Sequence, residues 1–342
     1  MTPPTPSAAA PLEVTDESVE KSITSPTPKA NESRSPGQLA WLRFKRDRTG
    51  VISALVVIFF FVVAIAAPLI ATLYGKDPTT TYGINTPGLL GDNSFPIKPN
   101  GGISSDFWFG LEPGLGRDVF TFLIYGIRNS LLIAAAVTVL VMIIGVVVGV
   151  TAGYVGGKSD WFIGRVIDIL LAFPSQLFFV AFTPVVLALF VAPDENTPTW
   201  LTVVSLIGVL TAFGWASIAR LLRGQVLALR EREFVEAAKV TGASPARIIF
   251  KELLPNLWTP ILIQATLLLP TMVTTEAGLA FLGVGVKETT PDWGVMLGRA
   301  ADVYQDDITY LLFPGITMVI FVLAFNLLGD SMRDALDPKT KR

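Results

Sequence analysis

Residues 230–256, REREFVEAAKVTGASPARIIFKELLPN, form the longest polar, helix-competent stretch between two strongly apolar runs of the chain. The part 231–240 predicts a short helix, with Val235 and Ala238 on one face. Gly242 follows, and a glycine just past a helical run commonly ends the helix in the left-handed conformation. The stretch therefore begins with a short helix and a glycine elbow.

A second short helix is predicted directly after the elbow. Ser244 offers an N-cap oxygen, and Pro245 stands at the first helical position, where its missing N–H costs nothing. We expect this helix to reach Leu254 and to end at Pro255. From pattern alone, an ordinary loop with two amphipathic helices and a docking device for a partner protein are equally good interpretations.

The composition places the chain in a membrane. Of its 342 residues, 51% are hydrophobic and only 16% are charged, and the apolar residues come in long blocks. The chain has no cysteine and no histidine, which excludes disulfides, Cys/His metal sites and histidine-dependent catalytic triads. The sequence therefore predicts an integral membrane protein with no catalytic and no metal site of these kinds.

Six apolar runs are long enough to cross the hydrocarbon core, which takes about 20 residues in a helix. They are 51–74, 130–154, 162–191, 200–222, 257–284 and 310–328. We therefore expect an all-α, polytopic membrane protein with six transmembrane helices and with both chain ends on the same side. Two connections stand out, a long outer loop at 75–129 and the polar segment 224–256.

The distribution of positive charge predicts the orientation. If the N-terminus is cytoplasmic, 20 of the 26 Lys and Arg residues lie in segments on the inner side. Cytoplasmic loops carry such an excess, so we expect both termini and the segment 224–256 to be cytoplasmic. Residues 1–38, rich in Pro, Ser, Thr and Ala, predict a disordered cytoplasmic tail, and 39–342 the transmembrane domain. A regulatory or partner-binding role for the tail stays an alternative.

The polar stretch also carries several residue types at fixed spacing: Glu236-Ala237-Ala238, three residues, Gly242, and then Leu254-Pro255. This motif resembles the EAA loop of ABC-importer permeases. Residues 107–110 (FWFG), 116–118 (GRD) and 333–338 (RDALDP) are similar to segments of the dipeptide and oligopeptide permeases of the DppC/OppC type. The resemblance covers about 40–338.

The resemblance implies a MetI-like, type I ABC-importer permease fold in the bacterial plasma (inner) membrane. It also implies that the chain forms half of a translocation pathway for di- or oligopeptides and that a second homologous permease forms the other half. Two cytoplasmic ATPase subunits would bind ATP and Mg and grip the EAA loop, and an extracytoplasmic solute-binding protein would deliver the solute. Membrane lipid is expected as a further partner, and nucleic acid is not. The coupling residues it implies are Glu236, Ala237, Ala238, Gly242, Ser244, Leu254 and Pro255.

Four further residues are candidates for the pathway or its gating. Pro174 should kink or break its span, and Asp168 can pair with Arg165 on one helix face. Glu276 is an acid within a span, which is expensive and points to a structural or gating contact, and Phe281 follows it in a stretch similar to the family's. The candidates for receptor contact are Trp108, Arg117, Asp118 and Trp293.

Alternative functions remain open at this point. Residues 153–159, GYVGGKS, nearly spell a phosphate-binding loop, but the spacing is one residue short and the stretch follows a membrane helix. An ion-coupled secondary transporter usually needs several buried ionisable groups, and only Asp168 and Glu276 lie in or at the spans. The interpretation as a membrane enzyme fails because the sequence has no histidine, no cysteine and no convincing pair of acids within the spans. An ABC permease for nickel or another small solute is not separated from a peptide permease by the sequence.

Overall fold

The chain is all-α in a computed structural model that describes residues 36–191 and 197–336. Across these residues, extended pairing is limited to three isolated bridges in and beside the outer loop. Residues 1–35 of the predicted tail lie outside the residues that the structure describes. Helix α2 (Pro36–Arg46) begins two residues before the expected boundary at 38.

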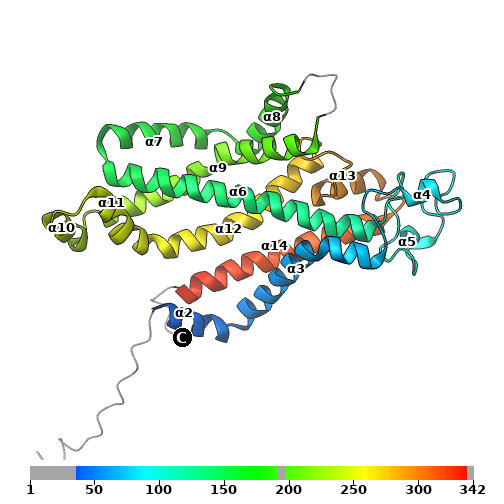
Figure 1. Cartoon of the computed structure of the whole chain (residues 1–342), viewed down its shortest axis with the longest axis horizontal. Helices are drawn as coiled ribbons and strands as arrows, with labels where there is room; N and C mark the ends of the chain where they lie inside the picture. Colours follow the sequence, from blue (N-terminus) through cyan, green and yellow to red (C-terminus); the bar gives the residue numbers. More distant parts are fainter. Residues whose placement is uncertain (1–35, 192–196, 337–342) are drawn as a thin grey trace, which may run out of the picture.

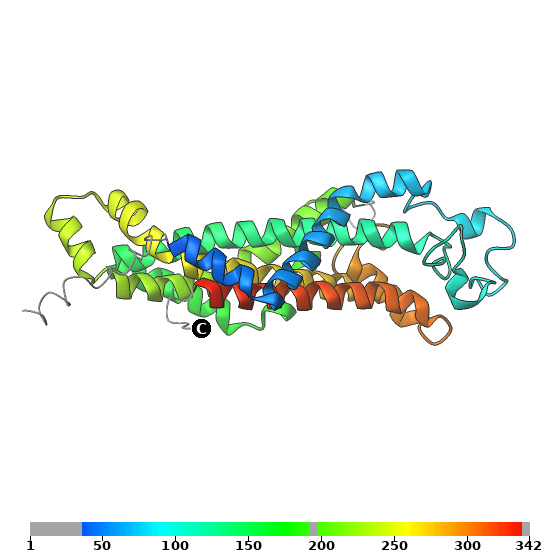
Figure 2. The same cartoon turned by 90° about the horizontal axis from the view of Figure 1, so that it is seen from below.

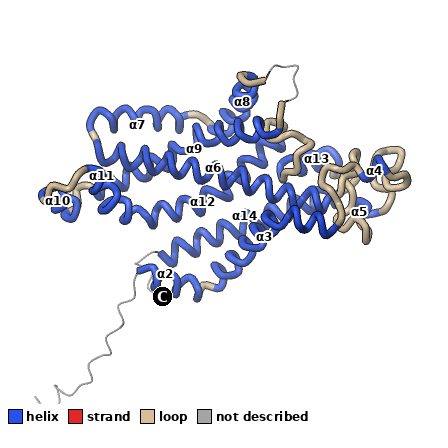
Figure 3. The backbone as a smooth tube through the Cα atoms, in the orientation of Figure 1, coloured by secondary structure: helices blue, strands red, loops and turns tan. Residues whose placement is uncertain are grey.

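Long apolar helices form the body of the molecule (Figures 1 and 3). Five are long and apolar enough to cross a membrane singly: α3 (Arg48–Tyr74), α6 (Val119–Val155), α9 (Thr199–Leu229), α12 (Leu254–Phe281) and α14 (Ile308–Leu336). The pair α7 (Gly157–Ala172) and α8 (Ser175–Ala188) takes the place of the predicted third span and is bent by 92°. The six predicted runs thus become five single long helices and one bent helix pair.

Helix α6 begins earlier than its apolar run predicts. Its N-cap is Asp118, whose side chain accepts a hydrogen bond from the Thr121 backbone N–H at 3.2 Å. Residues 119–129, expected in the outer loop, are therefore helical, and the loop ends at Asp118. The apolar side chains of this first part are buried against the rest of the molecule, which stabilises the helix beyond the hydrophobic span.

The centre of the bundle is the close contact of α6 and α9. Gly145, Gly149 and Gly153 recur every four residues along α6 and face α9. A Cβ at Gly149 would lie only 2.6 Å from the Ala219 carbonyl oxygen, so a larger residue would force the helices apart. Small residues at this spacing are a common basis for tight helix packing in membranes.

The two ends of the bundle differ in character. One end carries the outer loop with its short helices α4 (Tyr82–Asn85) and α5 (Pro99–Gly102), together with α13 (Trp293–Val303) (Figure 1). The opposite end carries α10 (Glu233–Val240) and α11 (Pro245–Arg247), which project beyond the long helices in both views (Figures 1 and 2). The start of α2 and the end of α14 lie toward this second end. The body therefore separates two specialised surfaces.

Candidate coupling segment and translocation site

The first half of the polar stretch folds as an eight-residue helix that ends at a glycine elbow. Helix α10 ends at Val240, and Gly242, two residues later, has a φ angle of 81°. The Gly242 N–H donates to the Lys239 carbonyl at 3.0 Å, and the Ala243 N–H donates to the Ala238 carbonyl at 3.0 Å. This pair of bonds is a Schellman motif, which requires a left-handed residue and favours glycine. The predicted glycine stop is confirmed.

The second half begins as predicted and then departs from the prediction. Ser244 caps α11, accepting from the Arg247 N–H at 3.3 Å. The helix does not end at Pro255. It continues through a π-helical segment, η1 (Ile248–Leu253), into α12, where Pro255 lies in the first turn. The Leu254 N–H donates five residues back, and this wider turn tolerates the proline ring and its missing N–H.

This segment contains both fully buried and highly exposed apolar residues. Val235 and Leu253 are fully buried and fix the segment to the bundle. Val240 is 87% exposed and Phe250 is 68% exposed, although both lie at the polar end of the molecule. Arg230 ties the approach to the end of α6 by donating to the Gly153 carbonyl at 3.1 Å. The result is an anchored tip with uncovered apolar side chains.

The EAA residues themselves form the body of α10. Ala237 is exposed, Ala238 is half-buried, and Glu236 pairs with Lys239 at 3.2 Å on the surface. Thr241 donates to the Ala237 and Ala238 carbonyls at 3.1 and 3.0 Å and so closes the last turn. The small side chains leave a low surface beside the exposed Val240.

Ion pairs join α7 to α9. The predicted partner of Asp168 is Arg165, but these groups are 3.9 Å apart, and Arg220 on α9 lies closer at 2.5 Å. Asp160 accepts both an Nε and an Nη bond from Arg223, also on α9. Neither contact between helices could be read from spacing along one helix. The predicted break at Pro174 is confirmed, because α7 ends at Ala172 and α8 begins at Ser175.

Glu276 lies in a buried junction of α12, α6 and α13. Its carboxylate faces Asp292 and Ser130, is fully buried and makes no hydrogen bond of ordinary geometry within the described residues. Asp292 caps α13, accepting from the Gly294 N–H at 2.8 Å and the Ser130 hydroxyl at 2.6 Å. Burial raises the pKa of Asp292, and the bonds from its partners oppose this rise. The position of Asp292 directly before a helix start could have signalled its role.

Most of the predicted receptor contacts are interior residues. Arg117 is buried and forms a two-pronged ion pair with Glu112, which also accepts from the Tyr310 hydroxyl at 3.1 Å. Asp118 and Trp293 are fully buried as well. These three side chains are therefore not on the surface that a docked protein could touch. Trp108, which is 52% exposed, is the exception.

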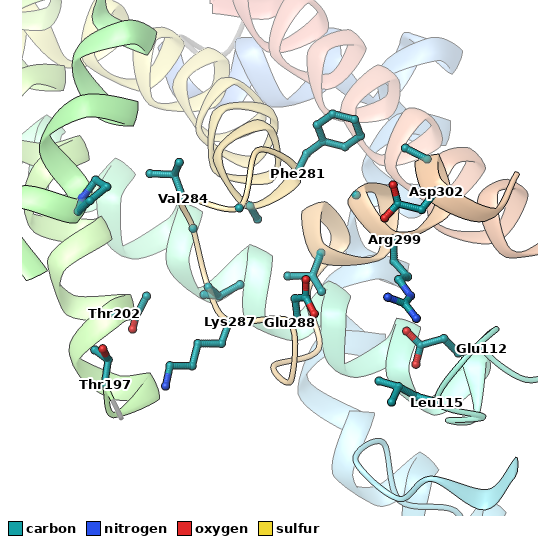
Figure 4. Close-up of a pocket in the computed structure, with 18 of the residues that line it drawn as sticks. Glu112, Leu115, Thr197, Thr202, Phe281, Val284, Lys287, Glu288, Arg299 and Asp302 are labelled. Carbon is teal, nitrogen blue, oxygen red and sulfur yellow. The ribbon is translucent and has the colours of Figure 1, made fainter. Parts of the chain in front are cut away.

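A cavity of about 570 Å³ lies between the outer loop, α8 and the connection from α12 to α13 (Figure 4). Phe281 lines it, as do Lys287, Glu288, Arg299 and Asp302. In Figure 4, Lys287 lies on the side of Thr197, and Arg299 lies beside Glu112 on the other. The Arg299 Nε is buried without a hydrogen-bond partner in the part of the chain that the structure describes. Positively and negatively charged side chains thus line the same cavity.

The molecule is thus a bundle of apolar helices with an anchored, apolar-tipped segment at one end and a charged cavity at the other, and this arrangement fits a membrane transport permease. The chain belongs to the family of binding-protein-dependent transport system inner membrane components, the ABC-importer permeases, in its peptide-transport branch. The family model matches residues 145–342, and the N-terminal TM domain of oligopeptide transport permease C matches residues 35–87.

Curated relatives agree with this placement. The dipeptide transport system permease protein DppC of Alkalihalophilus pseudofirmus is 36% identical over 90% of this chain and 91% of its own length. The oligopeptide transport system permease protein OppC of Bacillus subtilis is 34% identical over 89% and 90%. The glutathione transport system permease protein GsiD of Escherichia coli is 34% identical over 92% and 95%.

A solved structure shows the shared fold. The inward-facing MetNI methionine ABC transporter contains a chain that aligns with a TM-score of 0.50. The match covers 63% of this chain and 96% of that chain at 21% identity, so it supports the fold alone. The expected MetI-like architecture is confirmed.

Proposed function

We propose that this chain forms half of the pathway of an ATP-driven importer of di- and oligopeptides, and that α10 is the element gripped by an ATPase subunit. The names of the curated relatives support the peptide class, since they are permeases for dipeptides, oligopeptides and glutathione. The cavity supports it too, because cationic and anionic side chains together suit a zwitterionic solute better than a bare metal cation.

The observation that carries the coupling role is the exposed apolar tip. Val240 and Phe250 face outward although the residues beneath them are fully buried. Exposed apolar side chains rimmed by charge are typical of surfaces that bind another protein. The tip is small, so a concave partner surface could enclose it.

The proposed route for force follows one helix. The segment Pro245–Phe281 is continuous from the docking tip to the rim of the cavity. A displacement of α10 would therefore cross only the glycine elbow at Gly242 before the segment Pro245–Phe281 carries it to Phe281. Closing and opening of the ATPases would bias the permease between two conformations, as ligand contacts bias any two-state element.

The complete assembly needs other chains. We propose a second homologous permease, two cytoplasmic ATPases that hold ATP and Mg, and an extracytoplasmic solute-binding protein. In this arrangement the chain lies in the bacterial inner membrane with both termini and α10 in the cytoplasm. The excess of positive charge in the segments assigned inside supports this orientation. Trp108 remains a candidate contact for the binding protein.

Site-specific cross-linking tests the proposal. The chain has no cysteine, so Val240→Cys introduces the only thiol on this subunit. In the assembled transporter, a thiol-attached photocross-linker at this site should yield an adduct with an ATPase subunit. Ile97→Cys, a 59% exposed residue in the outer loop, is the matched control and should yield none. An ATPase adduct from Ile97→Cys, or none from Val240→Cys, would overturn the assignment.

A further inference from the structure

An apolar groove of about 930 Å³ lies at the α10 end of the bundle, between α2, α12 and α14. Its lining is mostly apolar and comprises Gly37, Leu39, Ala40, Trp258, Leu262, Ala335 and Leu336, together with the polar residues Arg43 and Thr259. Trp258 is 57% exposed, so the groove is open along at least this side chain. The position of the groove beside the ends of three helices puts it at the depth where a bilayer meets water.

Arg43 lines the groove, and further exposed cations follow it along the chain. Arg43, Lys45 and Arg46 form the last turn of α2, and Arg48 begins α3. All four side chains are exposed. The single carboxylate among them, Asp47, is engaged as the N-cap of α3 through the Thr49 N–H at 3.1 Å. The acids at the end of α14, Asp330 and Asp334, do not line the groove. The cluster is therefore a local excess of positive charge.

Helix α2 also has the aromatic residues of an interfacial helix. Trp41 and Phe44 stack at 6.0 Å between ring centroids, and the Lys45 ammonium lies 5.0 Å from the Trp41 ring. Trp41 is more than half exposed and Leu39 and Leu42 more than a third, although the helix carries three cations. Basic residues, tryptophan and leucine on a short helix beside a transmembrane span are typical of a segment lying in the headgroup layer.

We propose that this groove and the cations of α2 form a binding site for one anionic phospholipid, whose acyl chains occupy the groove and whose headgroup meets Lys45, Arg46 and Arg48. The ligand must be amphiphilic, because the apolar groove includes Arg43 in its lining and the other cations of the cluster follow within five residues. It must be anionic, because Lys45, Arg46 and Arg48 follow directly after the groove residue Arg43, and the one carboxylate among them, Asp47, is already engaged. Each basic residue near an anionic lipid surface contributes about 1 kcal/mol to its attraction.

Tryptophan quenching by brominated lipids tests the site in the full-length chain reconstituted into vesicles. The vesicles contain equal amounts of phosphatidylglycerol and phosphatidylcholine, and bromine is placed on the acyl chains of one lipid or of the other. The bulk composition is then identical in both samples. The difference in quenching between the natural chain and Trp258→Phe isolates the signal of the groove from the other six tryptophans.

We expect brominated phosphatidylglycerol to occupy the groove at least about fivefold more than brominated phosphatidylcholine, because the contribution of about 1 kcal/mol from a single basic residue already corresponds to this ratio. The triple variant Lys45→Gln, Arg46→Gln, Arg48→Gln should quench equally with both lipids. A matched control, Arg232→Gln, Arg247→Gln, Lys251→Gln, removes the same charge from exposed positions around α10 and should keep the preference.

Other outcomes would contradict the proposal. Equal quenching by both lipids in the natural chain would mean ordinary bilayer contact without selection. No Trp258 quenching by either lipid would mean that protein covers the groove, for example residues 1–35 or another subunit. If the triple variant fails to insert, high salt replaces it, because exposed charges are screened by salt. A preference that does not fall with salt would then overturn the role of the cations.

Discussion

Asp118 is a buried carboxylate at the start of α6, and its surroundings give it a pH signature. Burial raises its pKa from 3.8 to about 6, while hydrogen bonds from Thr121 and the charge of Lys76 oppose the rise. The folded chain therefore keeps a proton on Asp118 over a pH range in which the unfolded chain has lost it. Stability from this group is fully present below 3.8 and is lost as pH rises to about 6.

Substitution of Asp118 by Asn should remove this pH dependence. Asn caps a helix about as well as Asp, so α6 should keep its start. For a shift of this size, the free energy of unfolding of the natural chain should fall by up to about 3 kcal/mol between these pH values. Thermal unfolding in detergent from pH 4 to 7 measures the slope. Asp106→Asn, at an exposed site in the same loop, should leave the slope intact.

Glu276 was predicted as a structural or gating contact, and the structure places it in the junction with Asp292 and Ser130, away from the cavity lining. Glu276→Gln supplies amide donors toward Asp292 and should hold α12 and α13 together. If transport requires this junction to change, solute uptake should fall severalfold while the inserted amount of the chain stays unchanged. Uptake assays and membrane immunodetection measure the two quantities. Normal uptake would remove Glu276 from the gating residues.

The residue scale also shows where sequence reasoning stopped. An acid within a span is costly and faces either protein or water, and this alone marked Glu276 as a structural or gating contact. Its partner Asp292 lies on another element, and no spacing rule connects them. The same limit applies to Arg117, whose side chain pairs inward with Glu112 although its loop is on the surface. Local sequence predicts that a charge needs a partner, but tertiary packing decides which one.

At the scale of elements, the glycine elbow between α10 and α11 offers a sharp test. A Cβ at Gly242 would meet no atom within 4 Å, so substitution acts through the backbone alone. Gly242→Ala forces a left-handed conformation that costs about 1–2 kcal/mol on a residue with a Cβ. We expect this strain to loosen α10 and to lower solute-stimulated ATPase activity in the assembled transporter severalfold, without lowering insertion.

Gly224→Ala in α9 is the matched control. A Cβ there also meets nothing within 4 Å, but the backbone is helical and not left-handed. Alanine should therefore be tolerated or slightly stabilising at this site. Equal ATPase stimulation in both variants would show that the elbow conformation plays no part in coupling.

Two prolines show how far element boundaries can be predicted. Pro174 breaks its span as expected, because the residue before it is extended and a new helix starts after it. Pro255 was expected to end a helix and does not, because the π-helical turns of η1 accommodate its ring. Apolar periodicity located the crossings, whereas the early start of α6 depended on the Asp118 cap and on burial in the outer region.

At the scale of the whole molecule, α10, which ends at Val240, and the outer loop with α4 and α5, which contains Ile97, belong to opposite ends of the bundle (Figures 1 and 2). The bias of 20 of 26 basic residues toward the α10 side predicts that this end is cytoplasmic. In right-side-out vesicles, a membrane-impermeant maleimide should label Ile97→Cys and not Val240→Cys. Inverted vesicles should give the opposite pattern, and any other pattern would reverse or refute the orientation.

The overall architecture was the part most accessible from sequence. Blocks of apolar residues without charge can be stable only in a membrane, and their number sets the topology. The way the helices pack was not accessible, because the glycines of α6 at 145, 149 and 153 acquire meaning only when α9 lies against them. The cavity was also missed, since its charged residues come from the outer loop, from the connection between α12 and α13, and from α13 itself.

The π-helical turns of η1 set the rotation of the docking tip relative to α12, because both belong to or adjoin the continuous segment Pro245–Phe281. A π-turn holds one residue more than an α-turn, and each residue of a helix contributes about 100° of rotation and about 1.5 Å of length. Deleting one residue within Ile248–Leu253 should therefore leave α12 seated in the bilayer yet swing the tip by about a quarter-turn. The chain would insert normally and point Val240 in the wrong direction, a fault visible as a lost cross-link to the ATPase.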